Sequence, residues 1–261
     1  MYNLLSAGID KYQYDVSSSA NPVNAYDLGF NVTQANFKSD FTYYLNNKHT
    51  LNFGLNSILY KINPGTFEPN GPKSLINPDV VAPEKGLESA LYLGDKYDIT
   101  DNLTISAGVR VNMYNYLGPA TVNNYAPNLP KEPNNILDST QYPSGKFIKT
   151  YFGPDIRVSA RYLLSDNLSI KAGYNTLHQY VHLLSNSTSI SPTDVYKLSD
   201  VNIKPETGDQ VSLGLFKNAK NNTIEMSVEV YYKRLRDYLD YKSGAVLLLN
   251  HHIEQDVINT Q

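Results

Sequence analysis

Sustained alternation of apolar and polar residues is the feature of this sequence that most restricts its fold. In the stretch ISAGVRVNMY, residues 105–114, every second residue from Ile105 to Met113 is apolar, and Arg110 lies between two of them. Successive side chains of a strand point to opposite faces, so this pattern predicts a strand with one apolar and one polar face. Residues 168–175 and 224–233 repeat the pattern. We therefore expect an all-β fold of long antiparallel strands.

Nine segments show this alternation, and none shows the spacing of an amphipathic helix. The predicted strands are residues 2–15, 25–45, 50–62, 86–100, 103–117, 148–164, 168–181, 204–217 and 223–238. Several of these segments exceed the usual strand length of about 5–6 residues in soluble proteins. The sequence contains no apolar run of the roughly 18 residues that a transmembrane helix needs.

The connections between the predicted strands alternate in length. Short connections at 46–49, 100–102, 165–167 and 218–222 are rich in Asn and Asp, which suits tight hairpin turns. Long connections at 63–85, 118–147 and 182–203 hold most of the prolines. All short turns should therefore lie at one end of the sheet and all long loops at the other. This arrangement is typical of outer-membrane β-barrels, whose apolar side chains face lipid and whose polar side chains face the lumen.

The barrel interpretation assigns the charged residues in mid-strand to the lumen. A Lys or Arg that faced lipid at mid-membrane would cost about 2–4 kcal/mol, so the separation of the two faces is favourable. The predicted lumen-facing residues are Arg110, Arg157, Arg161, Lys171, Glu225 and Glu229. Tyrosines near the strand ends are expected to form interfacial girdles. They are Tyr43, Tyr44, Tyr97 and Tyr162 at the turn end, and Tyr60, Tyr114 and Tyr116 at the loop end.

Composition and motifs argue against several classes of function. A net charge of -3 over 261 residues offers no basic face for nucleic acid. The absence of cysteine excludes disulfides and thiolate metal sites. We find no Ser-His-Asp spacing, no Gly-rich phosphate loop and no motif of paired carboxylates. The sequence therefore predicts a protein that is not an enzyme, has no catalytic residues, and carries no cofactor or metal.

Candidate binding residues lie in and beside the long loops, because loops over a rigid scaffold often carry binding. His178 and His182 offer imidazoles, which are common ligands. Tyr125, Tyr180 and Tyr196 combine an apolar ring with a polar tip. For each of these five residues, the alternative is a structural role in ordering the loops. The adjacent His251 and His252 are weaker candidates, since neighbours on a strand face opposite sides.

Three segments resemble TonB-dependent outer-membrane receptors. Residues 92–110, YLGDKYDITDNLTISAGVR, are similar to a hairpin of that family in which Tyr and Asp precede a turn and Gly-hydrophobic-Arg ends the next strand. Residues 177–216 resemble a strand, an outer loop and an Ile-Lys-Pro return in Bacteroidota-type receptors. Residues 229–257 continue in the register of that family, and the resemblance extends over residues 26–257.

The resemblance implies an antiparallel up-and-down transmembrane β-barrel in the outer membrane of a Gram-negative bacterium, in contact with lipid. In that family a barrel of about 22 strands encloses an N-terminal plug domain. The receptor binds a siderophore, oligosaccharide, cobalamin or similar nutrient at its outer loops and imports it with energy from the TonB complex. With about nine or ten strands, residues 1–261 would form a partial barrel domain. The plug, a signal peptide and the C-terminal strands would then lie outside it.

Two other functions remain open at this level. A soluble all-β carbohydrate-binding or adhesin module would use the apolar face as the core of a sandwich. A passive outer-membrane porin would share the barrel and the alternation of loop lengths, but it would lack energy coupling. Strand periodicity alone does not separate these functions from an import receptor.

Overall fold

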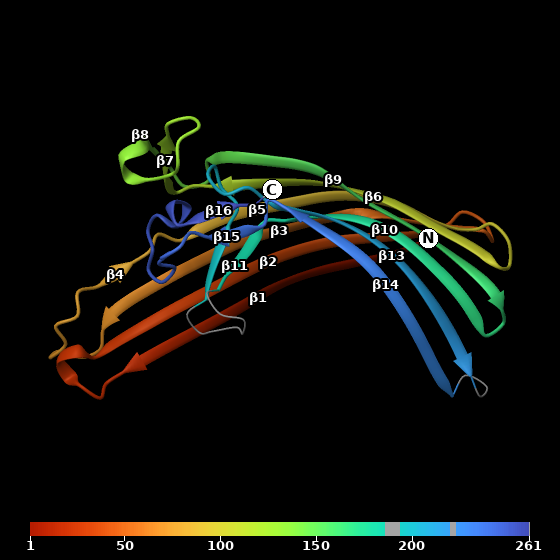
Figure 1. The fold of residues 1–261 in the computed structure, drawn as a ribbon, viewed down its shortest axis with the longest axis horizontal. Helices are drawn as coiled ribbons and strands as arrows, with labels where there is room; N and C mark the ends of the chain where they lie inside the picture. The colour runs from red at the N-terminus through yellow and green to blue at the C-terminus, as the bar shows by residue number, and fades with distance from the viewer. Residues whose placement is uncertain (186–193, 220–222, 261) are drawn as a thin grey trace.

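The computed structural model describes residues 1–185, 194–219 and 223–260, and antiparallel strands dominate it (Figure 1). One large sheet has the order β1-β2-β3-β5-β6-β9-β10-β13-β14, with β4 paired to β3. The strands are β1 (Tyr2–Ser18), β2 (Tyr26–Tyr44), β3 (His49–Pro69), β4 (Asp79–Val80), β5 (Glu84–Asp98), β6 (Leu103–Leu117), β9 (Phe147–Ser165), β10 (Leu168–Gln179), β13 (Glu206–Ala219) and β14 (Ile224–Arg236). Each of the nine long strands matches one predicted segment, within three residues at every boundary except the end of β3, which continues from the predicted residue 62 to Pro69. The up-and-down β prediction is therefore confirmed.

The two ends of the sheet differ as the connection lengths predicted. The turns at 46–49, 100–102 and 165–167 gather at one end in Figure 1, and residues 220–222 of the fourth turn lie outside the described part. Three extra hairpins, two of them at the long connections 118–147 and 182–203 and one after β14, were not indicated by the sequence pattern. They are β7 (Ala120–Tyr125) with β8 (Ile136–Tyr142), β11 (Val181–Leu184) with β12 (Val195–Leu198), and β15 (Leu239–Tyr241) with β16 (Val257–Asn259).

Helical structure is limited to single turns among the described residues. The three 3₁₀ turns are η1 (Pro22–Asn24), η2 (Pro133–Asn135) and η3 (Ile253–Gln255). None of these turns has the length or apolar character that a membrane-spanning helix requires.

The two faces of the sheet differ in chemistry. Val109 pairs with Leu93 and with Ile156 on the neighbouring strands, and cross-strand partners share a face. All three side chains are exposed, as are Leu213 and many other apolar residues of this outer face. The opposite face carries Arg110, and we call it the inner face. A sheet with its apolar face open and its charged face inside fits a membrane barrel, not a water-soluble sandwich.

The main hydrophobic cluster lies on the inner face, at the loop end of the sheet. It joins Tyr60, Tyr114 and Tyr116 to Tyr180 and Leu198, the last of which belongs to β12. The stacked rings of Tyr114 and Tyr180 have centroids 4.6 Å apart. The β11–β12 hairpin is therefore folded inward over the wall, where it covers the tyrosines.

This arrangement corrects the prediction of an aromatic girdle at the loop end. Tyr60, Tyr114 and Tyr116 are buried on the inner face. Tyr114 and Tyr116 stand an even number of residues from Arg110, so alternation places them on the charged side. At the turn end, Tyr43, Tyr44 and Tyr162 are exposed, but the adjacent Tyr43 and Tyr44 of β2 point to opposite faces, so at most one of these two can join a girdle on the outer face.

A second cluster packs the loop segments against one another. It is formed by Leu184, Val195, Ile203, Leu239, Leu247, Ile253 and Val257. These side chains come from the β11–β12 hairpin, the segment after it, and the region from β15 to β16. The loop segments that contribute to the two clusters are residues 180–185, 194–203 and 239–257. They rest on the inner face, and we call them the loop layer.

Candidate functional site

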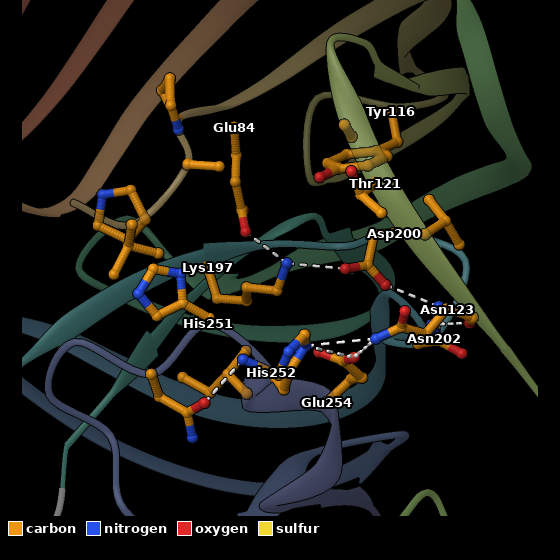
Figure 2. Close-up of a pocket in the computed structure, with 18 of the residues that line it drawn as sticks. Glu84, Tyr116, Thr121, Asn123, Lys197, Asp200, Asn202, His251, His252 and Glu254 are labelled. Atoms are coloured by element: carbon orange, nitrogen blue, oxygen red, sulfur yellow. Dashed lines mark hydrogen bonds and ion pairs between the residues drawn. The ribbon is translucent and has the colours of Figure 1, made fainter. Parts of the chain in front are cut away.

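A cavity of about 380 Å³ opens between the loop layer and the loop end of the sheet (Figure 2). Four separate parts of the chain line it: residues 64–84, 116–123, 195–202 and 250–254. The polar lining residues are Glu84, Thr121, Asn123, Lys197, Asp200, Asn202, Asn250, His251, His252 and Glu254. Concave sites with a few convergent polar groups are the usual form of small-molecule sites, so this cavity is the candidate site.

Lys197 is the central charged group of the cavity wall. Its Nζ lies 2.5 Å from Glu84 Oε1 and 2.7 Å from Asp200 Oδ2, and its side chain is only 7% exposed. The Tyr116 ring centroid is 5.8 Å from the same nitrogen, a cation–π contact. Burial lowers the pKa of Lys197, but the carboxylates of Asp200 and Glu84 outweigh burial and hold that pKa well above its usual range. The ammonium is therefore charged, and it is already paired with both carboxylates.

Glu84 and Asp200 are themselves fixed by backbone donors. The Leu198 amide donates to Glu84 Oε2 at 2.8 Å, which ties β12 to the start of β5. Asp200 Oδ1 accepts bonds from the amides of Asn202 at 2.7 Å and Ile203 at 2.8 Å. This Asx turn is the local reason that an Asp ends the hairpin. Together these bonds fix the positions of the Glu84 and Asp200 carboxylates in the cavity lining.

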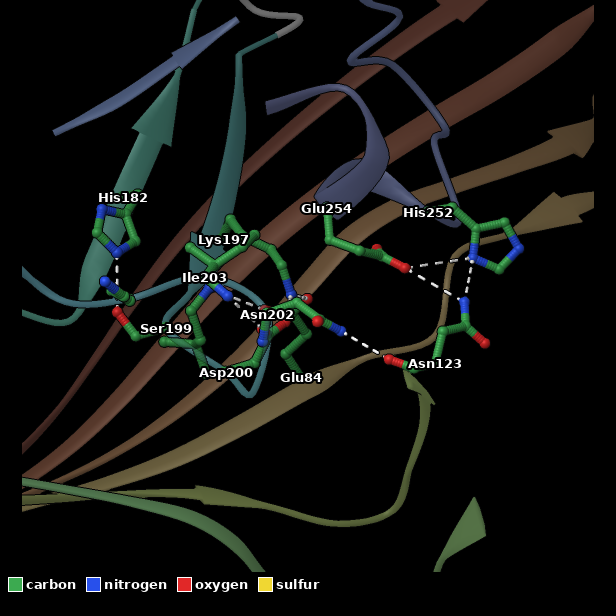
Figure 3. A network of polar contacts seen from close by, with 12 residues as sticks. Glu84, Asn123, His182, Lys197, Ser199, Asp200, Asn202, Ile203, His252 and Glu254 are labelled. Carbon is green, nitrogen blue, oxygen red and sulfur yellow. Dashed lines mark hydrogen bonds and ion pairs between the residues drawn. The ribbon is translucent and has the colours of Figure 1, made fainter. Parts of the chain in front are cut away.

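Glu254 is the centre of the second polar group (Figure 3). The Tyr125 hydroxyl donates to its Oε1 at 2.8 Å, and the Asn123 side-chain amide donates to the same oxygen at 3.2 Å. His252 Nδ1 lies 3.2 Å from that amide nitrogen and 3.8 Å from Glu254 Oε1. Asn202 donates from its side chain to the Asn123 carbonyl at 3.0 Å, which links this group to the Asp200 turn.

The cavity has an excess of negative charge. Three carboxylates, Glu84, Asp200 and Glu254, line it, and Lys197 is the single Lys or Arg among the described lining residues. On the rim, His251 Nε2 lies 2.7 Å from Asp79 Oδ1. No group of three His, Asp or Glu residues in the described part of the chain is arranged to hold a metal ion. The polar and acidic side chains of the lining offer a ligand hydrogen bonds and negative charge.

Three of the predicted binding residues lie outside the cavity lining. His182 is buried in β11, with Nε2 2.8 Å from Ser199 Oγ, and burial and the nearby Lys197 lower its pKa to about 4. Tyr180 lies under the hairpin in the main hydrophobic cluster. His178 Nδ1 lies 2.6 Å from Asp155 Oδ1 on the neighbouring strand. Tyr180 holds the hairpin to the wall by stacking on Tyr114. The His182 contact lies within the hairpin segment, whereas the His178 contact joins two strands of the wall.

The two remaining candidates, Tyr196 and Tyr125, also lie outside the cavity lining. Tyr196 projects from β12 toward Tyr12 of β1, with ring centroids 6.2 Å apart. Tyr125 stands behind the cavity, where its hydroxyl orients Glu254. The residues that sequence reasoning missed are Glu84, Asn123, Lys197 and Glu254. Their sole local signal is their position in or beside a long loop.

The charged side chains of the inner face fall into a paired group and an unpaired one. Arg110 Nη2 lies 3.3 Å from Glu88 Oε1, and Arg110 Nε donates to Asn112 Oδ1 at 2.7 Å. Nearer the turns, Arg157 and Lys171 line an open depression of about 630 Å³. We call this depression the bare wall.

Three other predicted lumen residues share the face of the bare wall. Arg161 is the cross-strand partner of Lys171. Gly214 pairs with both Lys171 and Glu229, so Glu229 lies on the same face, and Glu225 follows by alternation.

Comparison with known proteins identifies a family. A family model described as TonB dependent receptor-like, beta-barrel, matches residues 2–250. No curated protein matches the sequence significantly.

Several solved structures share the fold. The copper transporter OprC is 11% identical, with a TM-score of 0.58 over 93% of this chain and 38% of that chain. The FrpB iron transporter of Neisseria meningitidis, F5-1 variant in apoprotein form, is 12% identical, with a TM-score of 0.59 over 98% of this chain and 37% of that chain. The alcaligin outer membrane receptor FauA of Bordetella pertussis is 12% identical, with a TM-score of 0.51 over 99% and 41%. The chain thus spans about two-fifths of these proteins.

Proposed function

Since the chain belongs to the TonB-dependent receptor-like β-barrel family of the bacterial outer membrane, we propose that it forms part of the wall and the ligand-binding mouth of a nutrient-import receptor. Family membership and the open apolar face remove the case for a soluble carbohydrate-binding module. The narrower Bacteroidota-type assignment stays a prediction.

The chemistry of the two faces supports the assignment of the sheet as part of a barrel wall. The outer face contacts lipid through side chains such as Val109 and Ile156, which are exposed on the sheet. The inner face turns toward the lumen and carries Arg110, Arg157, Arg161, Lys171, Glu225 and Glu229. In the whole receptor we expect this face to contact the plug domain, and the plug to couple import to the TonB complex. We assign residues 1–261 to one part of the barrel domain, because the barrel model of the family matches residues 2–250.

The ligand site is the cavity under the loop layer, and one observation carries this assignment. Four loop segments far apart in sequence converge on one polar cavity at the long-loop end of the sheet. Loops supported by a rigid scaffold commonly carry binding. Glu254, Asn123, Thr121 and His252 line the cavity and are labelled in Figure 2, and we assign ligand contact to them.

A cavity-filling substitution tests this assignment in cells that express the whole receptor. Thr121→Trp places a large ring in the cavity, whereas Leu137→Trp alters the same β7–β8 hairpin at an exposed site. Uptake is measured for a radiolabelled panel: a ferric siderophore, heme, cobalamin, a maltooligosaccharide, tri-lysine and tri-glutamate. We expect uptake of at least one compound, about tenfold lower in Thr121→Trp and unchanged in Leu137→Trp.

The same assay separates active import from passive flow. An uncoupler of the proton-motive force should abolish uptake if the receptor is energised through TonB. Uptake that resists the uncoupler and follows only the size of the solute would identify a passive porin. Equal uptake by Thr121→Trp and the parent would show that the ligand binds elsewhere.

A further inference from the structure

We propose that the cavity selects ligands that carry positive charge, such as an ammonium group, and disfavours anionic ones. This inference rests on the proposed function, because it names the class of ligand for the same cavity. It rests on the charged side chains that line the cavity and on the ion pairs and hydrogen bonds that each of them already forms.

Lys197 does not offer its charge to an incoming anion. Its ammonium is 7% exposed and lies within 2.7 Å of carboxylate oxygens on both Glu84 and Asp200. An anionic ligand would have to displace one of these carboxylates from a buried pair. Because a buried carboxylate without its partner is strongly destabilising, this displacement is unfavourable.

Glu254 carries a negative charge that no Lys or Arg of the described residues neutralises in an ion pair, although Lys131, whose Nζ donates to the Asn202 carbonyl, lies near enough to interact with it electrostatically. Tyr125 and Asn123 donate to Oε1, and within the described residues no Lys or Arg forms an ion pair with this carboxylate. The Asn123 amide is held in place by its own oxygen, which accepts a bond from Ser139 Oγ at 2.7 Å. The carboxylate is therefore pre-oriented, and its Oε2 has no donor among the described residues. An ammonium placed at this oxygen would gain a charge-assisted hydrogen bond.

Each of the two imidazoles at the cavity lies beside a carboxylate. His252 Nδ1 lies 3.2 Å from the Asn123 amide nitrogen and 3.8 Å from Glu254 Oε1. His251 lies at the rim and contacts Asp79 at 2.7 Å. Among the Asp, Glu, Lys and Arg side chains, the three lining carboxylates outnumber Lys197 by two. Lys131, which lies outside the lining but interacts with Asp200 and Glu254, reduces this excess to one negative charge. In a partly buried site such a field discriminates between ligands of opposite sign.

The experiment compares two fluorescent peptides of opposite charge, tri-lysine and tri-glutamate, on the purified whole receptor. We expect tri-lysine to bind at least about tenfold more tightly than tri-glutamate at low salt. Glu254→Gln should reduce that ratio several-fold. Glu132→Gln is the matched control, because it removes one negative charge from an exposed position in the β7–β8 connection, outside the cavity lining.

Equal binding of the two peptides, tighter binding of tri-glutamate, or an unchanged ratio in Glu254→Gln overturns the charge proposal. The proposed function is judged separately with Thr121→Trp. If a neutral or anionic compound is imported and Thr121→Trp blocks it, the cavity is the binding site and the charge proposal is wrong. If Thr121→Trp leaves the import of every compound unchanged, the cavity assignment fails and the charge proposal fails with it.

Discussion

The loop-covered part and the bare part of the inner face use charged residues in opposite ways. Under the loop layer, Lys197 is buried between Glu84 and Asp200. On the bare wall, the described residues include no carboxylate within ion-pair distance of Arg157, Arg161 or Lys171. The same type of side chain therefore holds loops to the wall in one region and faces an open depression in the other. Partnering and burial, not charge itself, decide which role a residue has.

The largest expected effect comes from removing the cation of the covered region. Lys197→Met leaves Glu84 and Asp200 buried without a positive partner, which costs about 3–5 kcal/mol. We expect the β11–β12 hairpin to detach from the wall, and amide hydrogen exchange over residues 194–203 to accelerate strongly. Adding Glu84→Gln to this variant should recover part of the loss. Slow exchange in Lys197→Met would mean that the apolar cluster alone holds the hairpin.

Acid should weaken the covered region by a smaller amount. Burial lowers the pKa of His182 from 6.5 to about 4, so the folded protein favours the neutral ring. The stabilisation is complete above pH 6.5, declines as the pH falls, and is lost near pH 4; a shift of this size corresponds to about 3 kcal/mol. Hydrogen exchange over residues 181–184 should therefore rise between pH 7 and pH 5, after correction for intrinsic rates. His182→Gln should remove most of this pH dependence.

The smallest effect is expected on the bare wall. Lys171→Met and Arg157→Met remove solvated charges without leaving a buried partner, so the free energy of unfolding should change by no more than about 0.5 kcal/mol. Thermal unfolding of the whole receptor in detergent provides the measurement. A loss as large as that of Lys197→Met would show that these cations have partners elsewhere in the receptor. The contrast between the two regions would then disappear.

The sequence predicted the sheet well because alternation is a local property. The register of residues 105–114 already separates Val109 from Arg110, and the structure keeps that separation across neighbouring strands. The same rule, applied to Tyr114 and Tyr116, would have placed them on the inner face. Their position near a strand end indicates a girdle, but their parity with Arg110 decides which face they occupy.

The candidate site could not be predicted in the same way. Glu84 and Lys197 are 113 residues apart, and Asn123 and Glu254 are 131 apart. Nothing in the neighbourhood of either residue specifies its partner. The small hairpins that bring them together lie in Pro- and Asn-rich loops, where strand signals are short and weak. Tyrosines and histidines are chemically suited to binding a ligand, but Tyr180 and His182 are buried in the structure and have structural roles.

Strand order has a consequence for how the molecule assembles. Apart from the inserted hairpins, each long strand of the sheet pairs with the long strands before and after it in the chain, so the sheet can grow by successive hairpins with short loop closures. The cavity instead depends on contacts such as His251 with Asp79, 172 residues away. Contacts of such high sequence separation carry a large entropic cost until the sheet has formed. The binding site should therefore mature last during folding, after the wall that supports it.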